Sequence, residues 1–124
     1  MHEEFDKLVV AAFSEHVDAV YQTLDQLAAA IDLAAICLTQ TLLNDCKLLV
    51  CGNGVSGTLG QCFTTMLLNQ FEQERPSLPA IDLQAAAATI SAITTGYSFA
   101  EVFSRQIHAV GQAGDDCDSG CDSL

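Results

Sequence analysis

Basic residues are scarce in this sequence, and their scarcity argues against several functions. Lys7, Lys47, Arg75 and Arg105 stand against sixteen acidic residues, which gives a formal net charge of −12. Direct binding to nucleic acid requires a basic face, and an anionic membrane surface repels an acidic chain. We therefore expect no nucleic-acid and no membrane partner. No unbroken apolar run approaches the roughly 18 residues of a spanning helix, and MHEEFDK is not typical of a signal peptide, which favours the cytoplasm.

The sequence also lacks a CxxC pair, so a zinc site is not expected, and nothing in it calls for another metal or a cofactor. Its six cysteines do not have the arrangement of a disulfide framework. Four of them lie within apolar patterns of the helical or strand type, where cysteine acts as a small buried hydrophobe: Cys37, Cys46, Cys51 and Cys62.

Half of the 124 residues are apolar, which is enough for one folded domain. Apolar residues recur at steps of three and four from Phe5 to Ile31, a pattern that predicts a long amphipathic helix. Such a helix would extend roughly 40 Å, more than a small domain needs to cover its core, so we expect it to pack against another copy. Asp32 is the predicted N-cap of a second helix, Leu33 to Leu43.

The following segments alternate between strand and helix patterns. Buried strands are predicted at 47–52 and 80–83, with a helix from Leu59 to Phe71 between them that the two prolines of ERPSLP terminate. Further helices are predicted over 85–96 and 99–112, and this order favours an α/β fold with parallel strands. The sequence predicts helices for oligomerisation in 1–45 and a partial α/β domain in 46–115. The acidic residues 116–124 are predicted to form a disordered tail instead of a third strand.

A glycine-rich turn links the first predicted strand to the helix that follows. Gly52, Gly54 and Gly57 fit the pattern GxGxxG, and Asp82 ends the next strand, which together outline a dinucleotide-binding fingerprint. Two features argue against a dinucleotide site: two helices precede the strand, and the remaining chain has no room for a second nucleotide-binding half.

The same turn also fits a site for a single phosphate. In CGNGVS, the backbone of Gly52, Asn53 and Gly54 and the hydroxyl of Ser56 would hold a phosphate at a helix N-terminus. The competing interpretation is a turn that only reverses the chain.

The segment CGNGVSGTLGQCFTTMLLNQFEQERPSLPAIDL resembles the first strand, phosphate loop and helix of the SIS (sugar isomerase) domain, and EVFSRQIHAVGQAGD extends the likeness. Within that family the sequence is similar to the phosphoheptose isomerases and to the DnaA initiator-associating proteins. The resemblance implies a three-layer, flavodoxin-like fold and a homodimer or homotetramer built through the N-terminal helices. It also implies a sugar-phosphate ligand for the loop and DnaA as a partner.

The sequence departs from the catalytic pattern that the resemblance implies. Isomerases of the family carry a His and a Glu four residues apart after the loop, for metal binding and proton transfer, where this chain has Cys62 and Met66. Both are expected to be core residues. Thr95 and Gly96 replace an Asn-Asp pair, and DCDSGCDSL stands where the family continues with a third strand and a second phosphate loop. We therefore predict no catalytic residues.

Three functions remain open from the sequence. The first is a non-catalytic interaction protein similar to the DnaA initiator-associating proteins, acting in replication initiation. The second is an isomerase of sedoheptulose 7-phosphate. The third is a truncated remnant without function, because two parallel strands make a poor sheet.

Overall fold

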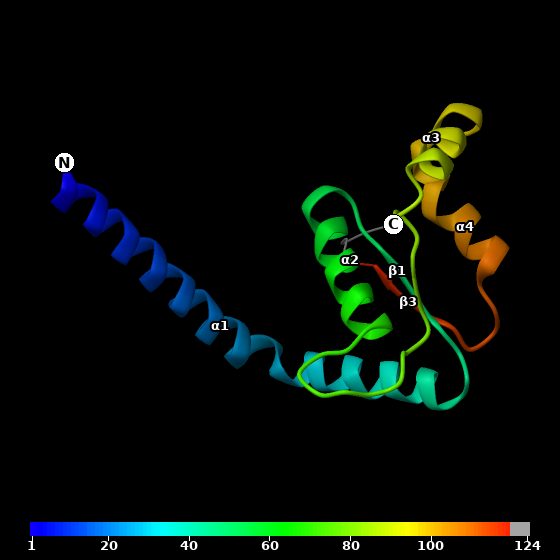
Figure 1. Cartoon of the computed structure of the whole chain (residues 1–124), viewed down its shortest axis with the longest axis horizontal. Helices are drawn as coiled ribbons and strands as arrows, with labels where there is room; N and C mark the ends of the chain where they lie inside the picture. The colour runs from blue at the N-terminus through cyan, green and yellow to red at the C-terminus, as the bar shows by residue number, and fades with distance from the viewer. Residues whose placement is uncertain (120–124) are drawn as a thin grey trace. The chain divides into compact units, whose positions relative to one another are not determined.

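The computed structural model describes residues 1–119, apart from the side chains of His2, Asp118 and Ser119. The chain divides into two compact units, Met1–Ile36 and Cys37–Leu124. The elements in order are α1 (His2–Leu43), β1 (Leu48–Cys51), α2 (Gly54–Leu68), β2 (Ala80–Asp82), α3 (Ala87–Gly96), the short 3-10 helix η1 (Phe99–Glu101), α4 (Val102–Val110) and β3 (Asp116–Ser119) (Figure 1).

The N-terminal segment forms one helix where the sequence predicted two. α1 continues through Asp32, so the predicted N-cap and the second helix beginning at Leu33 are wrong. The residues on both sides of Asp32 are mostly alanine, leucine and isoleucine, and no glycine or proline interrupts them. An aspartate inside a helix costs only a fraction of a kcal/mol, so these helix formers carry the helix past it.

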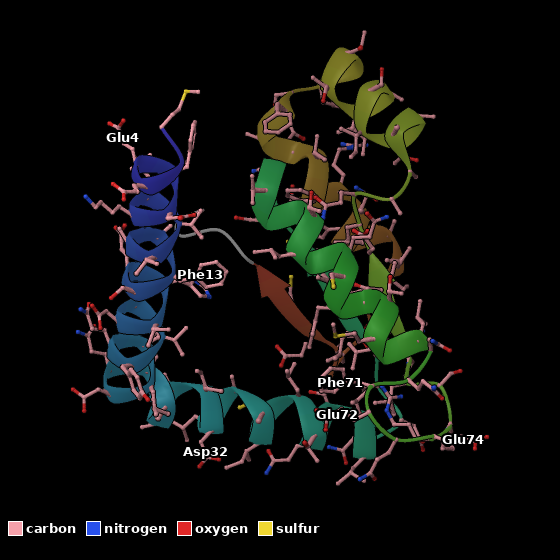
Figure 2. All side chains as sticks on the ribbon, turned by 60° about the vertical axis from the view of Figure 1, so that its left-hand side comes forward. Glu4, Phe13, Asp32, Phe71, Glu72 and Glu74 are labelled. Atoms are coloured by element: carbon pink, nitrogen blue, oxygen red, sulfur yellow. The ribbon has the colours of Figure 1, made fainter. Side chains whose placement is uncertain are left out.

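The first unit consists of the N-terminal part of α1, and its apolar residues are exposed. Phe13 is 68% exposed, Leu24 61% and Ile31 58%. In Figure 2, Glu4 and Phe13 project from opposite sides of α1, as expected for an amphipathic helix. Taken by itself, this unit therefore presents an apolar stripe along one helix face.

By length and composition alone, one helix could cross a membrane. The segment Glu3–Leu43 contains an 18-residue window with a mean hydropathy of 1.5, although the sequence has no apolar run of that length. Core helices of soluble proteins and signal sequences have the same properties, so this is weak evidence for a membrane location.

The second unit is built on a three-stranded parallel sheet in the order β2-β1-β3. β1 lies in the centre, and all four of its residues are buried. Leu49 and Cys51 contact Leu83 on one face of the sheet, where Phe103 and Ile107 of α4 pack against them. α2 packs on the other face, where Gly60 lies against Val50. Helix, sheet and helix give the predicted three-layer α/β arrangement.

β3 is a strand where the sequence predicted a disordered tail, so that prediction is wrong for Asp116–Ser119; residues 120–124 lie outside the described part. The strand pairs with β1, Leu48 beside Asp116 and Leu49 beside Cys117. The sequence pattern did not predict this strand because its residues are polar, whereas buried parallel strands are normally apolar. The backbone ladder needs no particular side chain, so a polar segment held in register can still pair.

A partly buried ion pair sets this register. Asp115 accepts hydrogen bonds from the backbone N–H of Lys47 at 3.0 Å and from its Nζ at 2.6 Å. The N–H of Gln112 donates to the same carboxylate at 2.7 Å. These donors, those of Lys47 first, lower the pKa of Asp115 from 3.8 to about 2. The contacts place Asp116 directly beside the start of β1.

The four cysteines expected in the interior have different environments. Cys51 is buried and Cys46 half-buried, but Cys37 and Cys62 are exposed, so the prediction is wrong for these two. Their apolar neighbours in the sequence lie on helices that bury a different face or none. A helical pattern shows which residues share a face, but not what covers that face.

Candidate functional site

The glycine loop lies at the carboxyl end of β1 and leads directly into α2. Gly52 follows the strand, Asn53 has an extended backbone at the N-cap position, and Gly54 begins the helix with φ +56°. That φ lies in the left-handed region, which glycine adopts without strain. Ligands of open parallel α/β sheets bind at this end of the strands, so the loop occupies a favourable position for a site.

Gly52 is required by close packing of the loop on itself. A Cβ atom at this position would lie 2.8 Å from the backbone N of Gly57 and 2.8 Å from the carbonyl carbon of Ser56. Real side chains do not approach backbone atoms so closely. The glycine therefore lets the end of β1 touch the first turn of α2.

The first turn of α2 supplies donors of the kind that bind anions. The N–H groups at a helix start have no intrahelical acceptor, and the helix dipole adds partial positive charge there. No acidic side chain lies in this turn, and the cap residue Asn53 makes no side-chain cap hydrogen bond. Ser56 is half-buried in the same turn. The structure thus brings Gly52, Asn53, Gly54 and Ser56 together around one helix end, while their ligand stays a prediction.

A cavity of about 350 Å³ opens beside the loop. Gly54, Gly57 and Thr58 line it from α2, and Asp82 and Gln84 line it from the end of β2. Val50 and Asp82 are neighbours in the sheet, so the turn after β2 lies next to the glycine loop. This volume is within the range of small-ligand pockets.

Gln84 closes one side of this cavity and was not identified from the sequence. Its Nε2 donates to the carbonyl oxygen of Gly57 at 2.5 Å, and any Cβ on Gly57 would collide with this side chain. A contact between residues 27 positions apart leaves no local pattern in the sequence. In the sequence, this contact could be inferred only from the expectation that the two predicted strands end side by side in the sheet.

Asp82 has one satisfied and one unsatisfied oxygen. Oδ1 accepts the N–H of Gln84 at 3.0 Å, which forms the turn after β2. Oδ2 is buried and has no hydrogen-bond partner among the described residues. The sequence singled out Asp82 as the acid of a dinucleotide fingerprint, and the structure places it on the wall of the loop cavity.

Cys62 and Met66 lie on the exposed side of α2, so the expectation that they are core residues is wrong. Cys62 is exposed, and Met66 is 37% exposed. α2 buries Gly57 and Thr64, and with Gly60 these residues form the opposite face. Small residues on that face let the helix lie close to the sheet and leave the larger apolar side chains outside.

The segment after α2 fixes the far end of the helix. Arg75 donates from Nη2 to the carbonyl of Met66 at 2.7 Å and from Nη1 to that of Leu67 at 3.0 Å. A cation at the carbonyl end of a helix satisfies orphan acceptors and complements the dipole. Phe71, Glu72 and Glu74 lie on the same segment (Figure 2).

Within residues 1–119, no group of three or more His, Cys, Asp or Glu side chains is placed to hold a metal ion. The exposed face of α2 is apolar near the loop, with Val55 79% and Leu59 67% exposed. This face has no titratable group other than the Cys62 thiol.

Fold, loop and helix define the class to which this protein belongs. Residues 12–116 match the SIS domain, and the chain belongs to the SIS domain family. Its α/β architecture agrees with that of a phosphoheptose isomerase from Francisella tularensis, with a TM-score of 0.85 and 41% sequence identity, over 94% of this chain and 60% of the other.

Curated relatives carry two different names. A phosphoheptose isomerase from Methylococcus capsulatus is 46% identical over 103 residues, which are 83% of this chain and 53% of the relative. The DnaA initiator-associating protein DiaA of Yersinia pestis (strain Pestoides F) is 43% identical over 107 residues, 86% of this chain and 55% of the relative. The chain thus spans about half the length of the curated relatives it matches.

Proposed function

We propose that this chain is a non-catalytic SIS-domain protein that binds a sugar phosphate at the glycine loop and acts through protein partners, as a DnaA initiator-associating protein does. The observation that carries the proposal is the chemistry of α2. Cys62 and Met66 occupy the positions at which the family resemblance implies His and Glu, and both lie on the exposed face of α2.

An aldose–ketose isomerase moves a proton between adjacent carbons, which requires a positioned base and acid. The thioether of Met66 has no proton to give and is a weak acceptor. The Cys62 thiol stands alone on this face, without a neighbouring His or carboxylate on the helix that would activate it. This helix therefore lacks the groups that the isomerase reaction needs.

The loop geometry supports phosphate binding without catalysis. The start of α2 offers free N–H groups and a positive dipole end, and the half-buried Ser56 adds a hydroxyl. Gly52 and Gly54 allow the backbone to approach a ligand closely. The four predicted phosphate-binding residues are Gly52, Asn53, Gly54 and Ser56.

The exposed stripe of α1 supports partner binding. Its side chains from Phe13 to Ile31 are each about half or more exposed, a contiguous apolar surface that is typical of an interaction site. We infer that a second copy covers this stripe, giving a homodimer or homotetramer, and that DnaA is the regulatory partner. We also propose a cytoplasmic location; Asp32 lies inside the most apolar part of α1, and burying its carboxylate in lipid would cost about 3 kcal/mol, which argues against α1 as a membrane span.

Two assays test the proposal on the full chain. In the first, purified protein is incubated with sedoheptulose 7-phosphate, with the Methylococcus capsulatus relative as the positive control. We expect no ketose–aldose conversion above the no-enzyme background. In the second, the chain is immobilised and purified DnaA is passed over it. We expect DnaA to be retained, and we expect the same chain added in solution as a competitor to abolish this retention.

The isomerase is the second candidate, and the relatives with that name favour it. Ketose–aldose conversion that co-elutes with the protein in gel filtration would establish the isomerase and contradict the non-catalytic proposal. A monomer that retains no DnaA and converts no substrate would leave the third possibility, a remnant without activity.

A further inference from the structure

The helix after the glycine loop carries its larger apolar side chains on the face away from the sheet. Towards the sheet α2 turns small residues, among them Gly57 and Gly60. Four residues on the opposite face form what we call the outer stripe of α2: Val55, Leu59, Cys62 and Met66. All four are exposed, Val55 to 79% and Leu59 to 67%. A helix with apolar residues on its outer face is normally covered by another surface.

α4 shows the usual arrangement of a surface helix. Phe103 and Ile107 pack against the sheet, and the outer face carries the exposed Arg105 and His108. α2 contains no charged residue at all, although the whole chain has a net charge of −12. Charged residues are depleted in the centres of protein interfaces. The outer stripe therefore has the composition of an interface and not that of a solvated surface.

The outer stripe is complementary to itself when its direction is reversed. Its residues are spaced by four, three and four positions, a pattern that is the same in both directions. An antiparallel second copy therefore brings Val55 opposite Met66 of the second copy, and Leu59 opposite Cys62 of the second copy. In each pair a larger side chain meets a smaller one, which lets the two helices interdigitate. The antiparallel arrangement also places opposite ends of the two helix dipoles together.

Electrostatics favours a second copy over a partner of another kind. Two acidic chains repel each other, and this repulsion is smallest where the contacting surfaces carry no charge. A basic partner would instead be attracted to the acidic parts of the chain and would gain nothing from an uncharged helix. The uncharged outer stripe thus fits another molecule of the same protein.

We propose that the outer stripe of α2 packs antiparallel against the same stripe of a second copy, as a self-association surface separate from the stripe of α1. Four residues per chain are far fewer than the roughly 20–30 per partner of a stable interface, so this contact does not hold two chains together alone. It joins pairs of chains that α1 has already associated, because each pair offers two outer stripes. Two different two-fold contacts per chain close a tetramer. The inference rests on the proposed association through α1 and adds a second contact to it.

The mass of the full chain in solution tests this contact. It is measured by light scattering after gel filtration, and we expect four chains for the unaltered protein and two for Leu59→Glu, because the new carboxylate would be buried without a partner. Leu59 is exposed in the single chain, so the substitution leaves the fold intact, which circular dichroism verifies. Leu43→Glu is the matched control. Leu43 is 78% exposed and lies outside the outer stripe, so this variant should remain a tetramer.

A disulfide cross-link tests the antiparallel register. Leu59→Cys places a thiol opposite Cys62 of a second copy, within disulfide reach. With diamide as the oxidant, we expect a covalent dimer on non-reducing gels, linked between positions 59 and 62 as mapped by mass spectrometry. Thr65→Cys is the matched control, because Thr65 is exposed on α2 and is also three residues from Cys62, but it lies outside the outer stripe. We expect no link between chains from position 65.

The outcomes separate the α2 contact from the association through α1. Equal masses for the unaltered protein and Leu59→Glu, at two chains or at four, overturn the α2 contact and leave the α1 association standing. A fall from two chains to one in Leu59→Glu supports the α2 contact and overturns the α1 association. A monomeric unaltered protein overturns both. A tetramer whose Leu59→Cys variant forms no link between positions 59 and 62 overturns the antiparallel contact.

Discussion

Replacing Gly52 by alanine tests how closely the loop packs on itself. The added methyl group would lie 2.8 Å from two backbone atoms, the N of Gly57 and the carbonyl carbon of Ser56, and 3.0 Å from the Cα of Gly57. These atoms belong to the first turn of a helix and cannot rotate away as a side chain can. Relief requires a shift of α2 against β1, and forced overpacking of this kind costs about 1–3 kcal/mol.

Gly96→Ala is the matched control for this substitution. Gly96 is the last residue of α3, and a Cβ there would meet no atom within 4 Å. Its φ is not in the left-handed region, so alanine is tolerated and its higher helix propensity offers up to about 1 kcal/mol of stabilisation. The two variants make the same chemical change and are expected to change stability in opposite directions.

The assay is urea unfolding followed by circular dichroism at 222 nm. For a small domain the free energy of unfolding falls by about 1–3 kcal/mol per M urea, so Gly52→Ala should lower the midpoint by about 1 M. Gly96→Ala should leave the midpoint unchanged or raise it. Equal midpoints for the two variants would refute the close approach of loop and helix.

Three further substitutions address the ion pair, the helix end and the exposed stripe. Asp115→Asn removes a carboxylate whose pKa is about 2 in the folded protein, below the ordinary value of 3.8. The stabilisation that this carboxylate provides is complete above about pH 4 and is lost as the pH falls towards 2. The melting temperature of the variant should therefore change less between about pH 4 and about pH 2 than that of the unaltered protein. An equally steep acid dependence in the variant would contradict this. Arg75→Met removes hydrogen bonds to Met66 and Leu67 and should cost about 1–2 kcal/mol in urea unfolding, whereas the exposed control Lys7→Met should cost almost nothing. Leu24→Asp places a charge in the α1 stripe, where Leu24 is 61% exposed, and should reduce the mass measured by light scattering to that of a monomer; an unchanged oligomer would exclude the stripe as its interface.

The order of elements in the second unit could be predicted from local patterns. The apolar run of β1 and the glycines that follow it predicted a strand, a turn and a helix. The structure contains all three, and α2 begins at Gly54. The predicted start at Leu59 was five residues late. Glycine lowers helix propensity but is favoured where the chain enters a tight turn, so sequence alone misplaced this boundary.

The loop part of the candidate site could be predicted because its residues are neighbours in the chain. Gly52, Asn53, Gly54 and Ser56 form one continuous segment, and the structure keeps them together at one helix end. Gln84 reaches Gly57 only because β1 and β2 pair in parallel. Such a contact depends on the register of the sheet, which no single segment encodes.

Local periodicity, the order of the elements and turn chemistry were enough to predict the α/β class, the parallel strands, the glycine loop and the amphipathic character of α1. Only the tertiary structure decided that Cys62 and Met66 are exposed, that polar Asp116–Ser119 pair as a strand, and that Asp82 lines the loop cavity. Each of these depends on which distant segment lies opposite a residue. Burial and backbone pairing are properties of two surfaces in contact, and a sequence pattern describes only one of them.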